Sequence, residues 1–224
     1  MNTKLTIKAF VFLILLSSSQ IGYTKDYIVE MIFFANTRAN SVHVSSNPST
    51  PNYQNAIPLN DSAQSYGFIP LPSETYTLTN KVAALNSSGQ YKVLKHVAWL
   101  QPGLAREDAL PVIIHAGKNY RNEFQERTFV SGDFNDQNLA KSQHVNELDG
   151  TIKVVLGRYL HVYTDLVYRR PFSLSSDPAS NPLGRDRLLA DFPVKTHRKM
   201  RSKELHYIDH PLLGILVEIR PASS

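Results

Sequence analysis

RKMRSKELHYIDHPLLGILVEI, residues 198–219, joins a basic segment to an apolar one through a polar turn. From Leu213 to Ile219 every second residue is apolar, which is the alternation of a half-buried strand. Before the turn, cations are dense, and such side chains stay in water or against an anionic partner; they are Arg198, Lys199, Arg201 and Lys203. The stretch therefore predicts a hairpin with one basic strand and one apolar strand.

The preceding run, residues 148–168, repeats this alternation over a greater length. Most of its even positions are apolar, and most of its odd positions are polar or aromatic. The apolar set is Ile152, Val154, Leu156, Leu160, Val162 and Leu166, and the other set is Lys153, Tyr159, His161, Tyr163 and Asp165. This pattern predicts one long strand, bent or bulged at Gly157, with one face in the core.

Shorter patterns predict the remaining elements. Residues 26–34 are apolar at nearly every position, as in a central strand. A helix with apolar Leu78, Val82 and Leu85 is expected over residues 74–88, before Gly89. Strands are expected at 91–99 and 112–116, and a weak one at 126–130. Long irregular loops are expected at 40–74, where Ser, Pro and Asn fill 17 of 35 positions, and at 171–192.

The sum predicts an α+β fold, mostly antiparallel β-sheet with one or two short helices and long irregular loops. Residues 25–224 are expected to form a single domain, because about 200 residues suit one core. Two small domains are the alternative.

The amino terminus predicts export. Lys4 and Lys8 precede the apolar run 9–16, and Gly22 and Thr24 offer small residues for cleavage. The run is shorter than the roughly 20 residues that span a bilayer, so residues 1–24 read as a cleaved signal peptide rather than an anchor. The chain has no cysteine, so disulfides and lipidation at a new amino terminus are excluded. A periplasmic protein without an integral membrane segment is expected.

Charge is concentrated in the last third of the chain. The formal charge is +5, and residues 151–224 carry an excess of basic side chains whereas residues 25–150 are slightly acidic. In the periplasm nucleic acid is not an expected partner. Wall peptide carboxylates, anionic lipids or an acidic protein remain as candidates.

Motifs for catalysis are missing. The sequence has no nucleophile elbow, P-loop or dinucleotide fingerprint, and clustered carboxylates such as Glu123 and Glu126 lie in a polar segment without an apolar pocket. His206 and His210 are spaced for a helical metal site, but on a strand they lie roughly 13 Å apart. No catalytic residue, metal or cofactor is predicted, and Asp209, His210 and Pro211 are assigned to a structural turn.

Paired cations and aromatics are the best candidates for ligand contact. Aromatic planes accept the C–H faces of sugars, and Arg binds carboxylates through two hydrogen bonds. The predicted binding residues are Arg158, Tyr159, His161, Arg169, Arg170, Arg198, Arg201, His206 and Tyr207. The alternative is that these side chains only furnish the solvent face of a sheet through cross-strand pairs.

Several motifs together resemble the CsiV family, small periplasmic proteins that bind peptidoglycan. They are YIVEMIFF at 27–34, HVAWLQP at 96–102, LDGTI at 148–152, RYLH at 158–161, DLVYR at 165–169 and RKMRSKELHYIDHP at 198–211. The resemblance implies a non-catalytic regulator that activates a class A penicillin-binding synthase together with its outer-membrane lipoprotein activator. A protein-interaction adaptor without direct wall binding and, third, an envelope enzyme remain as alternatives.

Overall fold

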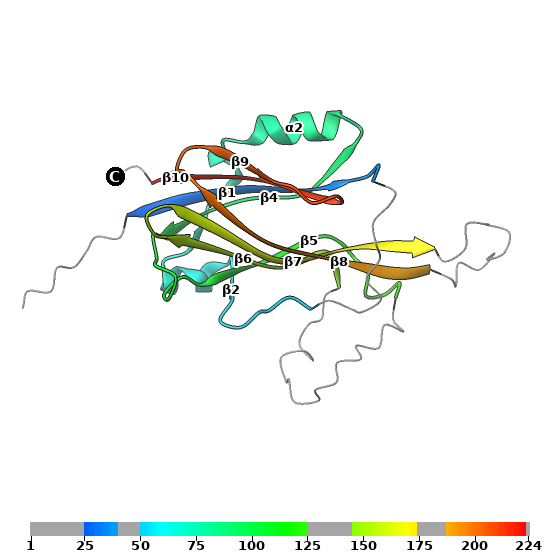
Figure 1. Cartoon of the computed structure of the whole chain (residues 1–224), viewed down its shortest axis with the longest axis horizontal. Helices are drawn as coiled ribbons and strands as arrows, with labels where there is room; N and C mark the ends of the chain where they lie inside the picture. The colour runs from blue at the N-terminus through cyan, green and yellow to red at the C-terminus, as the bar shows by residue number, and fades with distance from the viewer. Residues whose placement is uncertain (1–24, 40–49, 125–144, 174–186, 223–224) are drawn as a thin grey trace, which may run out of the picture.

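Two five-stranded sheets pack face to face in the computed structural model, which describes residues 25–39, 50–124, 145–173 and 187–222 (Figure 1). The first sheet has the order β3-β4-β1-β10-β9, with bounds Ile69–Pro70, Tyr91–Pro102, Asp26–Asn36, Leu213–Pro221 and Leu205–Ile208. The second has the order β2-β5-β6-β7-β8, with bounds Ile57–Pro58, Pro111–Asn119, Asn146–Leu156, Leu160–Ser173 and Arg187–Met200. Strand pairs are antiparallel except β2 with β5.

The core lies between the sheets and is built from alternate residues. Met31 and Phe33 of β1 are fully buried, as are Val217 and Ile219 of β10. The even positions predicted to be apolar in residues 148–168 face this core from the second sheet. The alternation in the sequence therefore identified the buried faces correctly.

Helices are few and short in the described ranges: α2 spans Thr79–Ser87, and 3-10 helices span Asp61–Tyr66 (η1) and Ser73–Thr75 (η2). Mostly antiparallel β-sheet is confirmed, whereas the α+β class fits the structure only loosely. The helix expected over 74–88 is present but begins later, at Thr79. Its apolar residues Leu78, Val82 and Leu85 pack on Ile32 and Phe34, on the outer side of the first sheet.

The prediction of a single long strand over residues 148–168 is wrong, because two strands, β6 and β7, cover this range. Gly157 does not bend a strand but begins the turn between β6 and β7, where its amide donates to the carbonyl of Tyr159 at 3.0 Å. The two halves then pair with each other, from Leu156 opposite Leu160 onward. Both halves keep the same alternation across the turn, so the pattern alone could not reveal it.

The predicted basic-apolar hairpin is also wrong. Arg198 and Lys199 belong to β8, which pairs with β7 in the second sheet, whereas β10 pairs with β9 in the first. The chain crosses between sheets at residues 201–204, where Lys203 adopts a positive φ of 67°. Residues 198–219 thus link the two layers of the sandwich.

Both predicted loops are shorter than expected. β7 continues to Ser173 and β8 starts at Arg187, so the loop assigned to 171–192 is wrong at each end. Residues 50–75 hold β2, β3 and both 3-10 helices, and they bury Ala63 and Phe68 completely. The buried apolar residues do not recur at a helix or strand period, and the high content of Ser, Pro and Asn therefore favoured a loop. The predicted signal peptide at 1–24, residues 40–49 and the strand predicted at 126–130 lie outside the described residues.

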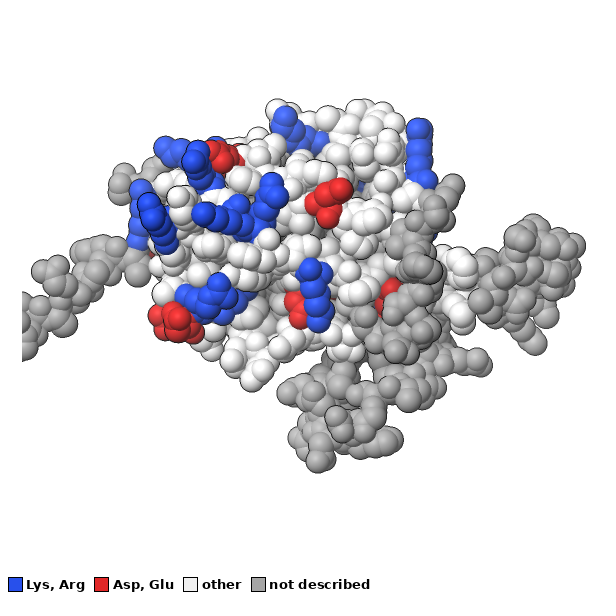
Figure 2. Space-filling model, in the orientation of Figure 1, with Lys and Arg blue, Asp and Glu red and all other residues white. Residues whose placement is uncertain are grey.

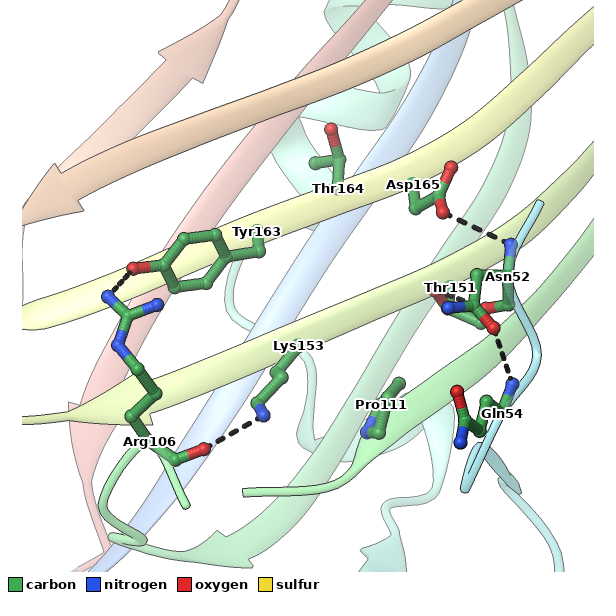
Figure 3. A pocket seen from close by; sticks show the side chains of 9 residues that line it. All are labelled: Asn52, Gln54, Arg106, Pro111, Thr151, Lys153, Tyr163, Thr164 and Asp165. Carbon is green, nitrogen blue, oxygen red and sulfur yellow. Dashed lines mark hydrogen bonds between the residues drawn. The ribbon is translucent and has the colours of Figure 1, made fainter. Parts of the chain in front are cut away.

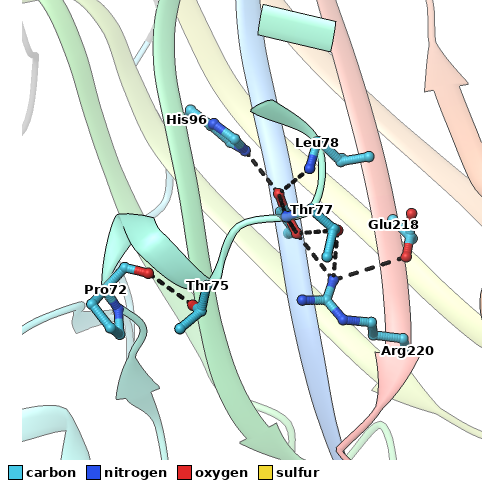
Figure 4. A network of polar contacts seen from close by, with 8 residues as sticks. Pro72, Thr75, Thr77, Leu78, His96, Glu218 and Arg220 are labelled. Carbon is cyan, nitrogen blue, oxygen red and sulfur yellow. Dashed lines mark hydrogen bonds and ion pairs between the residues drawn. The ribbon is translucent and has the colours of Figure 1, made fainter. Parts of the chain in front are cut away.

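A buried carboxylate fastens α2 to the first sheet. Glu30 of β1 is fully buried on the outer side of that sheet. It accepts hydrogen bonds from the amides of Thr77 (2.9 Å) and Leu78 (2.8 Å), just before α2, and it pairs with His96 at 2.9 Å and Arg220 at 3.0 Å (Figure 4). Burial alone would raise the pKa of Glu30, but these hydrogen bonds outweigh it and lower the pKa to about 2.

We expect Glu30→Gln to lower the free energy of unfolding at pH 7 by about 3 kcal/mol, because Arg220, His96 and the amides before α2 lose their common charged acceptor. Urea denaturation measures this loss. Glu218→Gln is the matched control, since Glu218 is only partly buried and 3.8 Å from the same Arg220. Its expected cost is below about 1 kcal/mol.

The contribution of Glu30 also has a defined pH dependence. Its pKa is lower in the folded state (about 2) than the ordinary value of 4.5, so its stabilisation is complete above pH 4.5 and is lost as the pH falls toward 2. The stability difference between wild type and Glu30→Gln should therefore shrink across this interval in urea titrations. A difference that stayed constant down to pH 2 would contradict the network.

Candidate functional site: the polar face of the second sheet

The side of β6, β7 and β8 that points away from the core carries polar and aromatic side chains. The structure pairs them in rows across the strands, because odd positions of all three strands share one side of the sheet. We call this surface the polar face: Thr151, Lys153, Tyr159, His161, Tyr163, Asp165, Lys195, His197 and Lys199, together with the adjoining Arg106 and Arg158. It draws residues from three segments of the chain.

Parallel rings form the centre of the polar face. The rings of Tyr163 and His197 stack with centroids 4.3 Å apart and planes at 4°, and His161 stacks on His197 with centroids at 5.1 Å. The two imidazoles also share a hydrogen bond, with Nδ1 of His161 2.9 Å from Nε2 of His197. One nitrogen of this pair must carry a proton and the other must not.

The surroundings favour the neutral form of His161. Burial lowers its pKa, and the positive charges of His197, Arg106 and Lys199 lower it further. The pair therefore keeps its hydrogen bond at neutral pH.

Cations stand on the aromatic side chains. The ammonium group of Lys199 lies 3.7 Å from the ring centroid of Tyr159, and the guanidinium of Arg158 lies 5.9 Å from the same centroid. Arg106 donates a hydrogen bond to the hydroxyl of Tyr163, with its guanidinium 4.9 Å from the ring centroid. Lys153 donates to the backbone carbonyl of Arg106 at 2.9 Å and so supports that loop. Figure 2 shows Lys and Arg gathered at the end of the molecule where β6 turns into β7.

A depression of about 260 Å³ opens beside Tyr163 (Figure 3). Arg106 and Lys153 stand at one end. At the other, Asp165 accepts from the backbone amide of Asn52 at 3.1 Å and pairs with Lys195 at 3.2 Å. The segment around Asn52 thereby forms one wall, and the depression offers cations at one end and a neutralised carboxylate at the other.

Arg169, one of the predicted binding residues, is structural. Its side chain is buried and pairs with Asp149 at 2.5 Å and Asp191 at 3.2 Å. Burial alone would raise the pKa of Asp149, but hydrogen bonds from His115 and the charge of Arg169 lower it. These ion pairs join β6, β7 and β8 through Arg169, and its predicted contact with a ligand stays a prediction.

The other predicted residues divide among separate surfaces. Arg158, Tyr159 and His161 lie on the polar face. Arg170 donates to the carbonyl of Ala39 at 2.9 Å. Arg198 is exposed but points to the opposite side of β8 from Lys199, because adjacent strand residues alternate.

The rest lie after β8, in the crossing between the sheets, in β9 and in the turn before β10. Arg201 lies 3.9 Å and His206 3.3 Å from Glu204. Tyr207 belongs to the outer side of the first sheet, where it stacks 6.1 Å from Phe34 and donates to Asp209 at 2.7 Å. His210 accepts from the amide of Leu212 at 3.3 Å, and Pro211 accepts from the side chain of Asn36 at 3.5 Å. The predicted binding residues therefore do not form one surface.

Sequence reasoning missed most of the polar face. Arg106, Lys195, His197 and Lys199 were not assigned to a site, although residues 195–199 alternate in the same way as residues 159–165. That shared period was the available indication. Only pairing of β7 with β8 shows that the two rows are neighbours.

Among the residues that the structure describes, no group of three His, Cys, Asp or Glu side chains lies close enough to hold a metal ion. No helix within the described ranges is long and apolar enough to cross a bilayer.

The architecture defines a two-layer β-sandwich protein with a helix on one outer side and an open, cationic face on the other. A family model described as "Peptidoglycan-binding protein, CsiV" matches residues 5–222. The chain therefore belongs to the CsiV family of peptidoglycan-binding proteins, which confirms the resemblance of its motifs and points to the cell envelope. No curated protein and no solved structure matches the chain.

The charges around the imidazole pair can be tested by titration. We expect Lys199→Gln to raise the pKa of His161, because it removes a positive charge that disfavours the imidazolium. Proton NMR of the ring signals measures the shift. Lys81→Gln, on α2 at the opposite side of the sandwich, should leave the pKa of His161 unchanged; an equal response to both substitutions would contradict the arrangement.

Proposed function

We propose that this protein binds peptidoglycan in the periplasm through the polar face, without catalysing a reaction. The observation that carries the proposal is an open sheet face on which Arg106, Arg158 and Lys199 are oriented by aromatic rings. Membership of a peptidoglycan-binding family supports the ligand. Residues 1–24, as a cleaved signal peptide, would deliver the chain to that compartment.

The resemblance extends the proposal to regulation. In this role the protein acts on cell-wall synthesis as an activator of a class A penicillin-binding synthase, together with the outer-membrane lipoprotein activator of that enzyme. A binding protein can do this by holding the synthase complex at the wall. Such a role needs a second surface for the protein partner.

A separate group of cations suits that second surface. Arg201 is largely exposed, with 76% of its side chain accessible, in the turn between the sheets, and Arg198 is exposed on the side of β8 away from the polar face. An adaptor that binds an acidic protein without touching the wall would use these residues instead. The two candidate functions thus assign binding to different cations.

Pelleting with purified sacculi separates them. We expect the mature wild-type protein to pellet at low salt, and Arg106→Glu with Lys199→Glu to lower the affinity for sacculi by about tenfold, which corresponds to about 1.4 kcal/mol. Arg198→Glu with Arg201→Glu has the same change in charge and should pellet like the wild type. Urea denaturation of both variants checks that they fold.

Other outcomes have distinct meanings. A wild-type protein that stays in the supernatant refutes wall binding. Equal loss in both double variants shows that net charge, not the polar face, drives association. Release of soluble muropeptides by the pure protein would contradict the non-catalytic role.

A further inference from the structure

Peptidoglycan offers two kinds of surface to a protein: the C–H faces of its sugar rings and the carboxylates of its stem peptides. Sugar rings bind by lying on an open aromatic plane, whereas carboxylates bind to cations, most specifically to Arg through two parallel hydrogen bonds. The contacts on the polar face distinguish between these two modes. The inference below rests on the proposed function.

The aromatic rings of the polar face already contact other side chains of the protein. His197 stacks on Tyr163 at a centroid distance of 4.3 Å, with the two planes nearly parallel. The ammonium of Lys199 lies 3.7 Å from the ring centroid of Tyr159 and occupies that side of the ring. A sugar would have to displace these groups before it could stack.

The cations, by contrast, are oriented but not neutralised. Within the described residues, Arg106, Arg158 and Lys199 have no carboxylate within ion-pair distance, whereas Lys195 is paired with Asp165 and Arg201 with Glu204. Cation–π contact holds a charge in place without cancelling it. The rings of Tyr159 and Tyr163 therefore position these cations and leave their charges available to an anionic ligand.

The three cations that are unpaired among the described residues are spread along the polar face rather than gathered at one position. Lys199 and Arg158 share the ring of Tyr159 at the β6–β7 turn, while Arg106 stands at the hydroxyl of Tyr163. The stacked His161 and His197 lie between these groups, since His161 and Lys199 are register partners and Tyr163 and His197 are the next pair. Such a row fits a peptide that carries more than one carboxylate.

We propose that the polar face recognises the free carboxylates of the stem peptides and not the glycan strand. The cations at Tyr159 take one carboxylate and Arg106, beside the depression, takes another. Arg106 and Arg158 bind with planar forks whereas Lys199 is a point charge, so each end of the row has an Arg that supplies geometric selectivity. Exposure to salt should weaken this contact strongly.

The test compares three ligands with the mature protein: intact sacculi, glycan strands stripped of peptides by an amidase, and the free stem peptide that the amidase releases. We expect pelleting with sacculi, at least tenfold weaker association with stripped glycan, and competition by the free peptide. The same peptide with its carboxylates converted to amides should compete at least tenfold less. Binding to stripped glycan equal to that with sacculi would overturn the inference while leaving the proposed function intact.

Point variants locate the contact. Arg106→Gln should lower the affinity for the free peptide, measured by calorimetry, by about tenfold, and Arg106→Lys should retain part of it because the charge remains. Lys81→Gln is the charge-matched control on α2. If Arg106→Gln binds the peptide like the wild type, the assignment is wrong. If the wild type fails to bind sacculi at all, the proposed function fails first, so the two failures are distinguishable.

Discussion

The burial of β1 between its neighbours and the second sheet is the interaction on which the rest of the structure depends. Val29, Met31 and Phe33 are fully buried and face the core, and complete burial of such side chains contributes roughly 1.5–3 kcal/mol each. β10 and β4 pair with the two sides of β1. The intervening residues of β1 point the other way, toward α2, so one strand organises both the core and the helix layer.

The outer sides of the two sheets differ in polarity, and this asymmetry distinguishes the candidate binding face from the side that α2 covers. The outer side of the first sheet is apolar around Ile32 and Phe34, so it requires the cover of α2, which Glu30 anchors. The outer side of the second sheet is polar along β6, β7 and β8 and needs no helix. Among the described residues, the segment near Asn52 and the loop at Arg106 contact this face, beside the rings and cations.

Arg169 and Lys199 show why candidate binding residues are difficult to select from composition. Both are cations near aromatic residues in a basic third of the chain. Arg169 is enclosed by Asp149 and Asp191, which come from other strands. The ammonium of Lys199 lies over the ring of Tyr159, and no carboxylate of the described residues is within ion-pair distance of it. A cation is available to a ligand when its neighbours in space leave its charge unbalanced, and those neighbours are distant in sequence.

The sequence by itself determined the faces: alternation placed Ile152, Val162, Val217 and Ile219 in the core, predicted a mostly antiparallel protein, and its motifs identified the family. Tertiary structure decided where strands end and which strands are partners. The alternation of apolar and polar residues does not reveal the turn at Gly157 or the crossing between sheets near Lys203. The strands before and after a turn both alternate with a period of two, so the pattern does not show where one strand ends. Which strands pair depends on how the two complete sheets bury their apolar faces against each other. The polar face forms because β7 pairs with β6 on one side and with β8 on the other.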